Sequence, residues 1–323
     1  MKQKKNYLIE TYLEFNPENW KIFCKTLPIQ ISNKKKELLK FPGKNHKIQK
    51  KEINKVYIPI TELLNFYISL NSHHNNFLKK TSYNTTNMTK IPYVIGIVGS
   101  VAVGKSTTAH LLKKLLSSDP LHHRVELITT DSFLYPNKTL QDKGIMHKKG
   151  FPQSYDMYNL IKFISEIKSG IKKVTAPIYS HFVYDIIPNK KKIIHRPDIL
   201  IVEGLNILQN NTDCQNTSHH LLVSDFLDFS IYIDAPENLL KNWYIKRFLK
   251  FCQKAFSNSK SYFYNYSKLN KTEIIKIAQA IWEEINKINL EKNIIPTKEK
   301  AKLIITKSYN HSIIKIQLKN NFI

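Results

Sequence analysis

Long hydrophobic runs are missing from this sequence of 323 residues. No apolar stretch approaches the ~18–20 residues that a helix needs to cross a bilayer. The Lys- and Asn-rich start also has neither the apolar core nor the small-residue cleavage site of a secretory signal. We therefore expect no membrane as a partner and a cytoplasmic location.

Cysteine is nearly absent too. The three cysteines, Cys24, Cys214 and Cys252, lie far apart and form no C-x-x-C pair. Zinc ribbons and thiol redox centres need such pairs, so the spacing excludes both. Each cysteine is expected to be a packed or surface thiol, because a free cysteine usually behaves as a small apolar side chain.

Acidic residues are scarce: 25 Asp and Glu stand against 50 Lys and Arg, for a formal net charge of +25. Such a charge is typical of proteins that bind nucleic acids. Here, however, the lysines are spread along the chain, and the dense clusters Lys34–Lys36 and Lys190–Lys192 lie beside predicted loops. No basic-aromatic recognition motif is seen. We expect solvated basic faces that attract anionic nucleotides, and no nucleic acid as a partner.

What the chain does contain is 42% hydrophobic residues with regularly spaced aromatics, which is typical of a folded globular protein. Two apolar-periodic pieces, Trp20–Leu27 and Ile53–Leu70, predict a helical N-terminal extension over residues 1–90 that packs on a core formed by residues 91–323. The length fits one large domain or a domain with an appended lobe. We expect extension and core to form one structural domain.

From residue 91 onward, short runs rich in Val and Ile alternate with helical patterns. The strand-like runs are Ile91–Val98, Val125–Thr130, Asp198–Val202, Phe229–Ile233 and Lys302–Thr306. The helical patterns are Lys105–Leu116, Tyr155–Lys168, Glu237–Ala255 and Thr272–Leu290, the last capped by Thr272. Unbroken apolar strands between helices are typical of a parallel sheet buried on both faces. The pattern predicts a three-layer α/β fold with a mostly parallel central sheet.

A phosphate-binding loop precedes the first of these helices. Residues 99–106 match G-x-x-x-x-G-K-[ST] at every fixed position, after an apolar strand and before a helical pattern. Backbone N–H groups there would cradle phosphates, with Lys105 at the β- and γ-phosphates and Ser106 on Mg²⁺. The expected nucleotide-binding residues are Gly99, Ser100, Val101, Ala102, Val103, Gly104, Lys105, Ser106 and Thr107. The motif predicts a P-loop NTPase-type fold with ATP and Mg²⁺ as cofactors.

Two acids follow predicted strands. Asp131 comes at the end of one strand and Glu203 at the end of another, and open α/β sheets bind ligands outside the carboxyl ends of their strands. Asp131 can accept the proton of an attacking hydroxyl, and Glu203 can support the metal or its waters. Either acid could instead only cap the next turn, but their place beside a P-loop favours phosphoryl transfer.

One face of the helix predicted at Glu237–Ala255 mixes a cation with aromatic rings. Tyr244, Arg247, Phe248 and Phe251 have the spacing i, i+3, i+4 and i+7. In an ordinary amphipathic helix Arg247 would extend outward to solvent. Beside a phosphate site, it could stabilise charge on the transferred phosphoryl group.

A further polar segment follows Pro177. It looks extended from Tyr179 to Asp185, so Tyr179, His181 and Asp185 would point to the same side. These groups could hold a small polar acceptor. His181 could equally be an ordinary hydrogen-bonded surface histidine.

Taken together, these motifs resemble the bacterial type I pantothenate kinase family, over a region from about residue 12 to about residue 315. The matching stretches are Val56–Ser69, Gly99–Thr108, Val125–Asp131, Lys149–Met157, Tyr179–His181, Val223–Pro236 and Trp243–Phe251. The resemblance implies a homodimeric kinase that uses ATP to phosphorylate pantothenate at its terminal hydroxyl, the entry step to coenzyme A.

The same resemblance implies roles for individual residues. Asp131 would be the base or the residue that orients the hydroxyl, and Lys105 and Arg247 would stabilise the phosphoryl group. The pantothenate pocket would be lined by Tyr179, His181, Tyr244, Arg247, Phe248, Phe251 and Asn286. The adenine would lie near Lys307, His311 and Asn45.

Two positions depart from the family pattern. Ser132 stands where the family has a Gly after the catalytic Asp, which is expected to alter only the turn. His110 stands where an Arg helps the family bind coenzyme A as a feedback inhibitor. The resemblance therefore implies coenzyme A as a partner, with weaker inhibition than in the family.

Three other functions fit parts of the sequence. A related P-loop kinase would act on uridine or a phosphorylated sugar. A basic nucleotide-dependent protein would bind nucleic acid, and its ATPase would respond to RNA or DNA. A P-loop protein could also bind nucleotide only for regulation, although the intact Lys105, Ser106, Asp131 and Arg247 argue against this.

Overall fold

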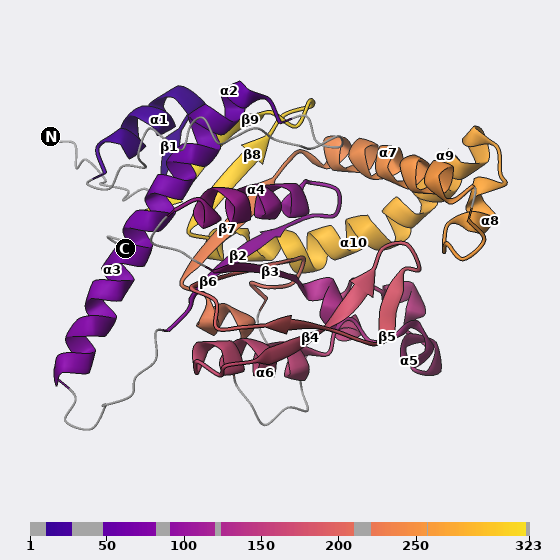
Figure 1. The fold of residues 1–323 in the computed structure, drawn as a ribbon. Helices are drawn as coiled ribbons and strands as arrows, with labels where there is room; N and C mark the ends of the chain where they lie inside the picture. The colour runs from indigo at the N-terminus through magenta and orange to yellow at the C-terminus, as the bar shows by residue number, and fades with distance from the viewer. Residues whose placement is uncertain are drawn as a thin grey trace, which may run out of the picture.

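A computed structural model describes residues 11–27, 48–81, 91–119, 124–209, 221–256 and 258–320. At its centre is a seven-stranded sheet with strand order β1-β9-β8-β7-β2-β6-β3 (Figure 1). Its strands are β1 (Tyr12–Phe15), β2 (Tyr93–Gly99), β3 (Val125–Thr129), β6 (Ile199–Gly204), β7 (Phe229–Asp234), β8 (Leu303–Lys307) and β9 (Ile313–Lys319). A separate hairpin pairs β4 (Val174–Ser180) with β5 (Asp185–Ile194).

Five neighbouring strands of the sheet run parallel, which confirms the predicted class of sheet. β2 pairs in parallel with β6 and β7, and β3 and β8 extend the parallel set on either side. Every residue of β2 and of β6 is buried, which explains their unbroken apolar runs. The carboxyl ends of β2, β3 and β6 meet at one edge, where open α/β sheets bind ligands.

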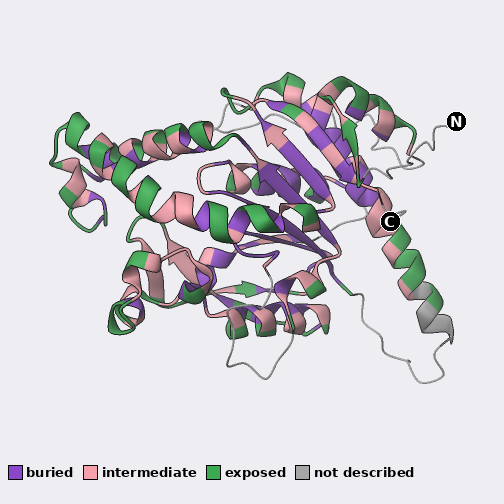
Figure 2. Cartoon of the chain, turned by 180° about the vertical axis from the view of Figure 1, so that it is seen from behind, coloured by how far each residue is buried: buried purple, intermediate pink, exposed green. Residues whose placement is uncertain are grey.

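Helices cover both faces of this sheet. α4 (Lys105–Ser117) lies over the face seen in Figure 1, and the helical segment from α9 (Lys271–Ile281) to η9 (Leu290–Ile294) crosses the opposite face, seen in Figure 2. The other short or helical elements of the core are η3 (Thr130–Phe133), α5 (Asn137–Asp142), η4 (Met146–Lys148), η5 (Pro152–Ser154), α6 (Met157–Lys168), η7 (Val223–Phe226), η8 (Trp282–Asn286), α10 (Lys287–Asn289) and η10 (Ile295–Lys300). The fold is the three-layer α/β arrangement that the pattern predicts.

The N-terminal part of the chain is helical and also supplies a strand. It contains α1 (Pro17–Lys25), α2 (Lys50–Glu52), η2 (Ile53–Tyr57) and the long α3 (Ile58–Thr81). Trp20 of α1 is fully buried and donates its indole N–H to the Val56 carbonyl at 3.4 Å. β1 pairs antiparallel with β9 at the edge of the sheet. The sequence pattern does not predict β1, because four residues carry too little periodicity to identify a strand.

A smaller lobe projects from the main core (Figure 1). α7 (Glu237–Ala255) runs outward into it and packs there with α8 (Tyr264–Ser267) and α9. The lobe has its own buried apolar cluster, formed by Phe248, Cys252, Ala255, Phe263, Ile274 and Ala278. α7 therefore serves two cores, since Leu240 and Trp243 near its start belong to the main one.

The prediction of Thr272 as a helix cap is wrong. α9 begins after Asn270, whose side chain accepts the Glu273 N–H at 3.0 Å, and the Glu273 carboxylate accepts the Asn270 N–H at 3.0 Å. This reciprocal pair satisfies two N–H groups at the helix start, which Thr272 inside the helix could not do. The helix also continues past its predicted end to Ile294, through the π-helical segments η8 and η9.

Two predictions about surface and thiol residues have mixed outcomes. Lys190–Lys192 lies in β5 rather than beside a loop, and Lys192 donates to Glu126 at 2.9 Å. Cys24 and Cys252 are buried free thiols, as expected. Lys34–Lys36 and Cys214 fall outside the described residues. Within the ranges described above, no helix combines the length and apolar character that crossing a bilayer requires.

Candidate active site

The phosphate-binding loop joins β2 to α4, as its sequence context predicts. Gly99 and Gly104 have φ angles of 145° and 99°, a region that favours glycine. A Cβ at Gly99 would lie 2.4 Å from the Ile233 carbonyl oxygen of the neighbouring strand β7. The backbone therefore turns tightly against the sheet and leads into the N-terminus of α4, where free N–H groups and the helix dipole favour anions.

The loop and the start of α4 carry a cation, Lys105, and a hydroxyl, Ser106, that binds an acid. Lys105 Nζ donates to the Ser100 carbonyl at 2.9 Å, and Ser106 Oγ donates to Glu203 Oε1 at 3.0 Å. Burial lowers the pKa of Lys105 and raises the pKa of Glu203, while the attraction between their charges opposes both shifts. A phosphate bound at this loop would lie near the Lys105 ammonium group and near the oxygen atoms of Ser106 and Glu203.

Asp131 lies just beyond the end of β3, in η3. Its Oδ1 accepts the Tyr155 hydroxyl at 3.4 Å. Burial and the nearby Asp131 charge raise the pKa of Tyr155, so the phenol remains a protonated donor. Ser132 is buried and does not have a positive φ, so this turn does not require the glycine that the resemblance predicts here.

A cleft of about 410 Å³ extends from the phosphate-binding loop to the α7–α9 lobe. Many of the predicted site residues line it together: Val101, Lys105, Ser106, Asp131, Tyr179, His181, Glu203, Tyr244, Arg247, Phe248, Phe251 and Asn286. They come from the loop after β2 and the start of α4, from η3, from the ends of β4 and β6, and from the helices α7 and η8. The fold thus gathers groups that are far apart in the sequence.

The mixed face of α7 points into this cleft. The Arg247 guanidinium lies 5.2 Å from the centre of the Phe251 ring, in the cleft wall rather than extended to solvent. Tyr244 hydrogen-bonds the Asn286 side chain, and burial raises the pKa of Tyr244 to about 12. The cleft wall therefore offers a fixed cation, a neutral phenol and an amide.

The segment from Tyr179 to Asp185 is a hairpin turn, so the prediction of one extended segment is wrong. The rings of Tyr179 and His181 lie edge to face at 5.3 Å and line the cleft. Asp185 instead accepts the backbone N–H of Asn137 at 3.0 Å. Desolvation in the cleft and nearby cations lower the pKa of His181, while Asp131 opposes the shift. A neutral imidazole is therefore favoured there.

Part of the cleft wall is not predicted from the sequence. Lys149 Nζ donates to Asn137 Oδ1 at 2.6 Å and lies 4.3 Å from the centre of the Tyr184 ring. Burial lowers the pKa of Lys149 to about 8, although Asp185 and Asp131 oppose the shift. Other lining residues that were not predicted include Leu134, Tyr184, Tyr262, Phe263, Tyr266 and Asn289. The sequence around Lys149 has no helical or strand period that would predict its place in the cleft wall.

Two residues predicted to lie near an adenine are described, and neither lines this cleft. Lys307, at the end of β8, donates its Nζ to the Val103 carbonyl at 3.0 Å. His311, in the turn between β8 and β9, stacks on Trp243 with ring centres 3.7 Å apart. Asn45 lies outside the described residues.

A P-loop between β2 and α4, acids at the edge of a parallel sheet and a cleft beside them define a P-loop kinase. The profile described as "Phosphoribulokinase / Uridine kinase family" matches residues 94–250. Among solved structures, D-glycerate 3-kinase from Cryptococcus neoformans is similar with a TM-score of 0.50 and 14% identity, over 80% of this chain and 98% of that chain. At this identity the likeness shows the fold alone.

Curated relatives are much more similar in sequence. Pantothenate kinase from Yersinia enterocolitica is 54% identical over 319 residues, covering 99% of this chain and 100% of that protein. Pantothenate kinase from Serratia proteamaculans is 54% identical over 312 residues, covering 97% of this chain and 98% of that protein. The chain belongs to the pantothenate kinase family.

Proposed function

We infer that this protein is a pantothenate kinase, which transfers the γ-phosphoryl group of ATP to the terminal hydroxyl of pantothenate. The product is 4′-phosphopantothenate, and the reaction is the first step of coenzyme A biosynthesis. The observation that carries the inference is that one cleft brings the P-loop side chains Lys105 and Ser106 together with Asp131 and a polar, aromatic wall. Such a cleft can hold a triphosphate and a small polar acceptor together.

Catalysis by these residues would consist mainly of positioning and charge stabilisation. Asp131 would accept or orient the proton of the attacking hydroxyl, held in place by the Tyr155 hydroxyl. Lys105 and Arg247 would stabilise the negative charge of the transferred group, because both cations line the cleft. The ring of Phe251 supports the Arg247 guanidinium from one side.

The polar and aromatic part of the cleft wall, which we call the acceptor wall, suits a small substrate with hydroxyl and amide groups, such as pantothenate. Tyr179, His181, Tyr244 and Asn286 supply hydrogen-bonding groups, and Phe248 and Phe251 supply apolar surface toward the far end of the cleft. A neutral phenol and a neutral imidazole can donate to, or accept from, hydroxyl and amide groups. Lys149 adds a cation to the same wall and would attract an acidic acceptor.

The oxygen atoms beside the loop fit Mg²⁺. Magnesium prefers oxygen ligands and is usually bound by few protein groups together with substrate phosphates. The Ser106 hydroxyl and the Glu203 carboxylate lie 3.0 Å apart, and we propose that they hold the ion directly or through water. When bound, Mg²⁺ neutralises phosphate charge.

The nucleotide base would lie beside Lys307 and the stacked pair of His311 and Trp243, with Asn45 as a further contact. An exposed histidine stacked on an indole offers a flat surface to a purine. A homodimer and a cytoplasmic location stay predictions from the family resemblance.

The test is ADP release from Mg·ATP in the presence of pantothenate, uridine, a phosphorylated sugar or RNA, one at a time. We expect pantothenate alone to drive stoichiometric ADP release, with 4′-phosphopantothenate as the product identified by mass. Release that responds to uridine or a phosphorylated sugar would support the other P-loop kinases. Release that responds to RNA and declines steeply with salt would support a nucleic-acid-dependent ATPase.

We also expect weak feedback by coenzyme A, because His110 replaces a family arginine. His110 is exposed on α4, and partial burial and the charges of Lys113 and Lys192 lower its pKa. The imidazole is therefore neutral near pH 7 and attracts phosphate poorly. Lys113 and Lys192 are both held by the Glu126 carboxylate, so neither offers the paired N–H groups of the missing arginine.

His110→Arg is expected to lower the half-inhibitory concentration of coenzyme A about tenfold, the scale of one charge-assisted hydrogen bond. The measurement is inhibition of pantothenate phosphorylation at fixed ATP. Because the pKa of His110 lies below 6.5, inhibition of the natural protein should strengthen only on acidification below that pH, and the arginine variant should lack this change. Equal inhibition of the two proteins near pH 7 would contradict the prediction.

A further inference from the structure

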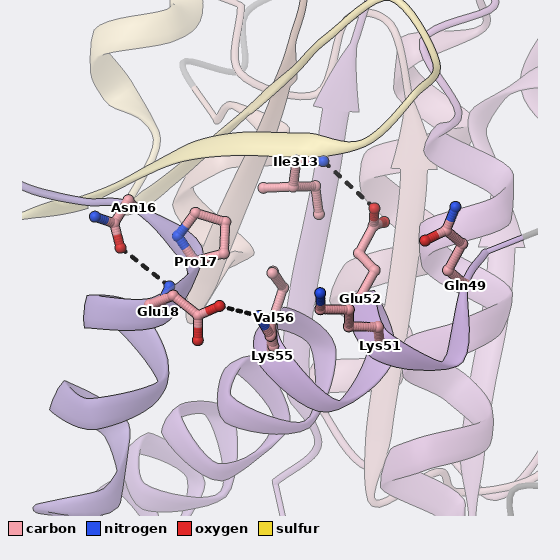
Figure 3. Close-up of a pocket in the computed structure, with 9 residues that line it drawn as sticks. All are labelled: Asn16, Pro17, Glu18, Gln49, Lys51, Glu52, Lys55, Val56 and Ile313. Atoms are coloured by element: carbon pink, nitrogen blue, oxygen red, sulfur yellow. Dashed lines mark hydrogen bonds and ion pairs between the residues drawn. The ribbon is translucent and has the colours of Figure 1, made fainter.

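A second cleft lies between the start of α1, the α2–η2 segment and β9 (Figure 3). It encloses about 310 Å³ and contains two acids with different partners. Glu18 forms an ion pair with Lys55. Glu52 points instead toward β9, where its Oε2 accepts the Ile313 N–H at 3.4 Å. Glu52 therefore bridges the N-terminal helices and the last strand of the sheet.

Ile313 pairs directly with Lys307 across the two strands, so Glu52 reaches β9 beside that lysine. Lys307 is only 4% exposed, and its Nζ donates to the Val103 carbonyl inside the phosphate-binding loop at 3.0 Å. The contact is close, because a Cβ on Gly104 would lie 2.8 Å from the same nitrogen. A buried ammonium is costly unless an opposite charge lies nearby.

Glu52 supplies that charge. Burial lowers the pKa of Lys307 to about 8, and Glu52 is the group that opposes this shift. In turn, burial raises the pKa of Glu52, while the Ile313 N–H and the Lys307 charge lower it. Each group thus favours the charged form of the other.

The other charged groups on the surrounding elements are directed elsewhere. Asp234 of β7 pairs with Lys298, and Lys315 of β9 pairs with Glu14. Lys105 of α4 donates to the Ser100 carbonyl, and Lys55 of η2 pairs with Glu18. His311 stacks on Trp243, and Lys51 of α2 is exposed. Among the charged groups of these described elements, Glu52 is therefore the acid that can hold Lys307 in its charged form.

We propose that Glu52 is a positioning residue for nucleotide binding, which keeps Lys307 charged and fixed against the Val103 carbonyl of the phosphate-binding loop. The proposal rests on the proposed function to the extent that this loop holds the phosphates of ATP. Lys307 then both supports the loop backbone and adds positive charge beside the loop that binds the nucleotide. Glu52 itself touches neither ATP nor acceptor; it acts through Lys307.

The test is Glu52→Gln, which keeps the size of the side chain and an oxygen that can accept the Ile313 N–H. Without the carboxylate, the pKa of Lys307 should fall below about 8. The KM for ATP of the natural protein should rise as the pH passes about 8, because Lys307 then loses its charge. The KM of the variant should rise about one pH unit lower, because one neighbouring charge shifts a pKa by about that much. Near pH 6.5 the two should agree, while kcat and the KM for pantothenate remain unchanged.

Two further variants make the result specific. Glu18→Gln removes a charge from the same cleft but not from Lys307, so its profile should coincide with that of the natural protein. Lys307→Met should raise the KM for ATP at every pH and remove the alkaline rise, and adding Glu52→Gln to it should change nothing more. A Glu52→Gln profile that superimposes on the natural one, or a KM for ATP raised equally at every pH, would overturn the proposal.

Direct ATP binding by calorimetry, measured over the same pH range without acceptor, separates this proposal from the proposed function. If pantothenate fails to drive ADP release, the kinase assignment fails, yet the dissociation constant for ATP still reports the Glu52 effect. If pantothenate drives release and the dissociation constants of Glu52→Gln and the natural protein agree at every pH, only the role of Glu52 fails.

Discussion

We expect Asp131→Asn to lose about 100- to 10,000-fold in kcat for pantothenate phosphorylation, the usual contribution of a general acid–base residue. An amide has the shape of the carboxylate but cannot take a proton from the attacking hydroxyl. It can still accept the Tyr155 hydroxyl, which lies 3.4 Å from Oδ1 in the natural protein. The loss should therefore appear in kcat, with little change in the KM for ATP.

The matched control is Asp142→Asn, which removes one negative charge from an exposed position on α5. It should leave kcat unchanged. Steady-state ADP release at saturating ATP and pantothenate measures both variants, and thermal unfolding checks that both are folded. A kcat for Asp131→Asn within threefold or so of the natural value would show that this carboxylate positions no proton in the rate-limiting step.

Gly204→Ala should lower the free energy of unfolding by about 3 kcal/mol, at the upper end for overpacking a buried site. A Cβ on Gly204 would lie 2.0 Å from Thr130 Oγ1 and 2.9 Å from Thr130 Cβ. The Thr130 side chain cannot move away easily, because Thr130 is buried and the preceding strand β3 is paired in parallel with β6. Activity should also fall, by about tenfold or more, because Thr130 precedes Asp131 and Gly204 follows Glu203.

Gly144→Ala is the control for this second prediction. Its Cβ would meet nothing within 4 Å, and its φ of 66° adds only the modest cost of a left-handed backbone. Denaturant unfolding and kcat should be measured for both variants. Equal destabilisation by the two substitutions would mean that the close approach of β6 and Thr130 relaxes without cost, contrary to the prediction.

Some site residues are predictable because their signal is local. The P-loop motif gives its spacing and its strand and helix on either side within about ten residues, and the structure has β2 and α4 where that context requires them. The face of α7 is equally local, since a helical period puts Tyr244, Arg247, Phe248 and Phe251 together. What this pattern leaves open is where Arg247 points, which depends on the lobe that packs against α7.

Other site residues cannot be predicted from the sequence, because no local pattern of residue types marks their positions. Lys149, which lines the cleft, lies among short turns that have no helical or strand period. Tyr155, which donates to Asp131, was expected to start a helix, but α6 begins at Met157 and Tyr155 lies just before it. The hairpin between Tyr179 and Asp185 was mistaken for one strand, since Phe182 and Val183 in its turn are as apolar as strand residues. Where periodicity is weak, contacts with other segments decide the conformation.

The sequence by itself determined the α/β class, the phosphate-binding loop, the acids that follow two strands and the family, because each depends on short-range spacing or on residue identity along the chain. Tertiary structure alone decided that β1 completes the sheet beside β9, that Ser106 meets Glu203, and that Lys307 is buried against Val103 under the charge of Glu52. The physical reason is distance along the chain. Such contacts form between segments that no local period relates, and they exist only once the sheet has brought those segments together.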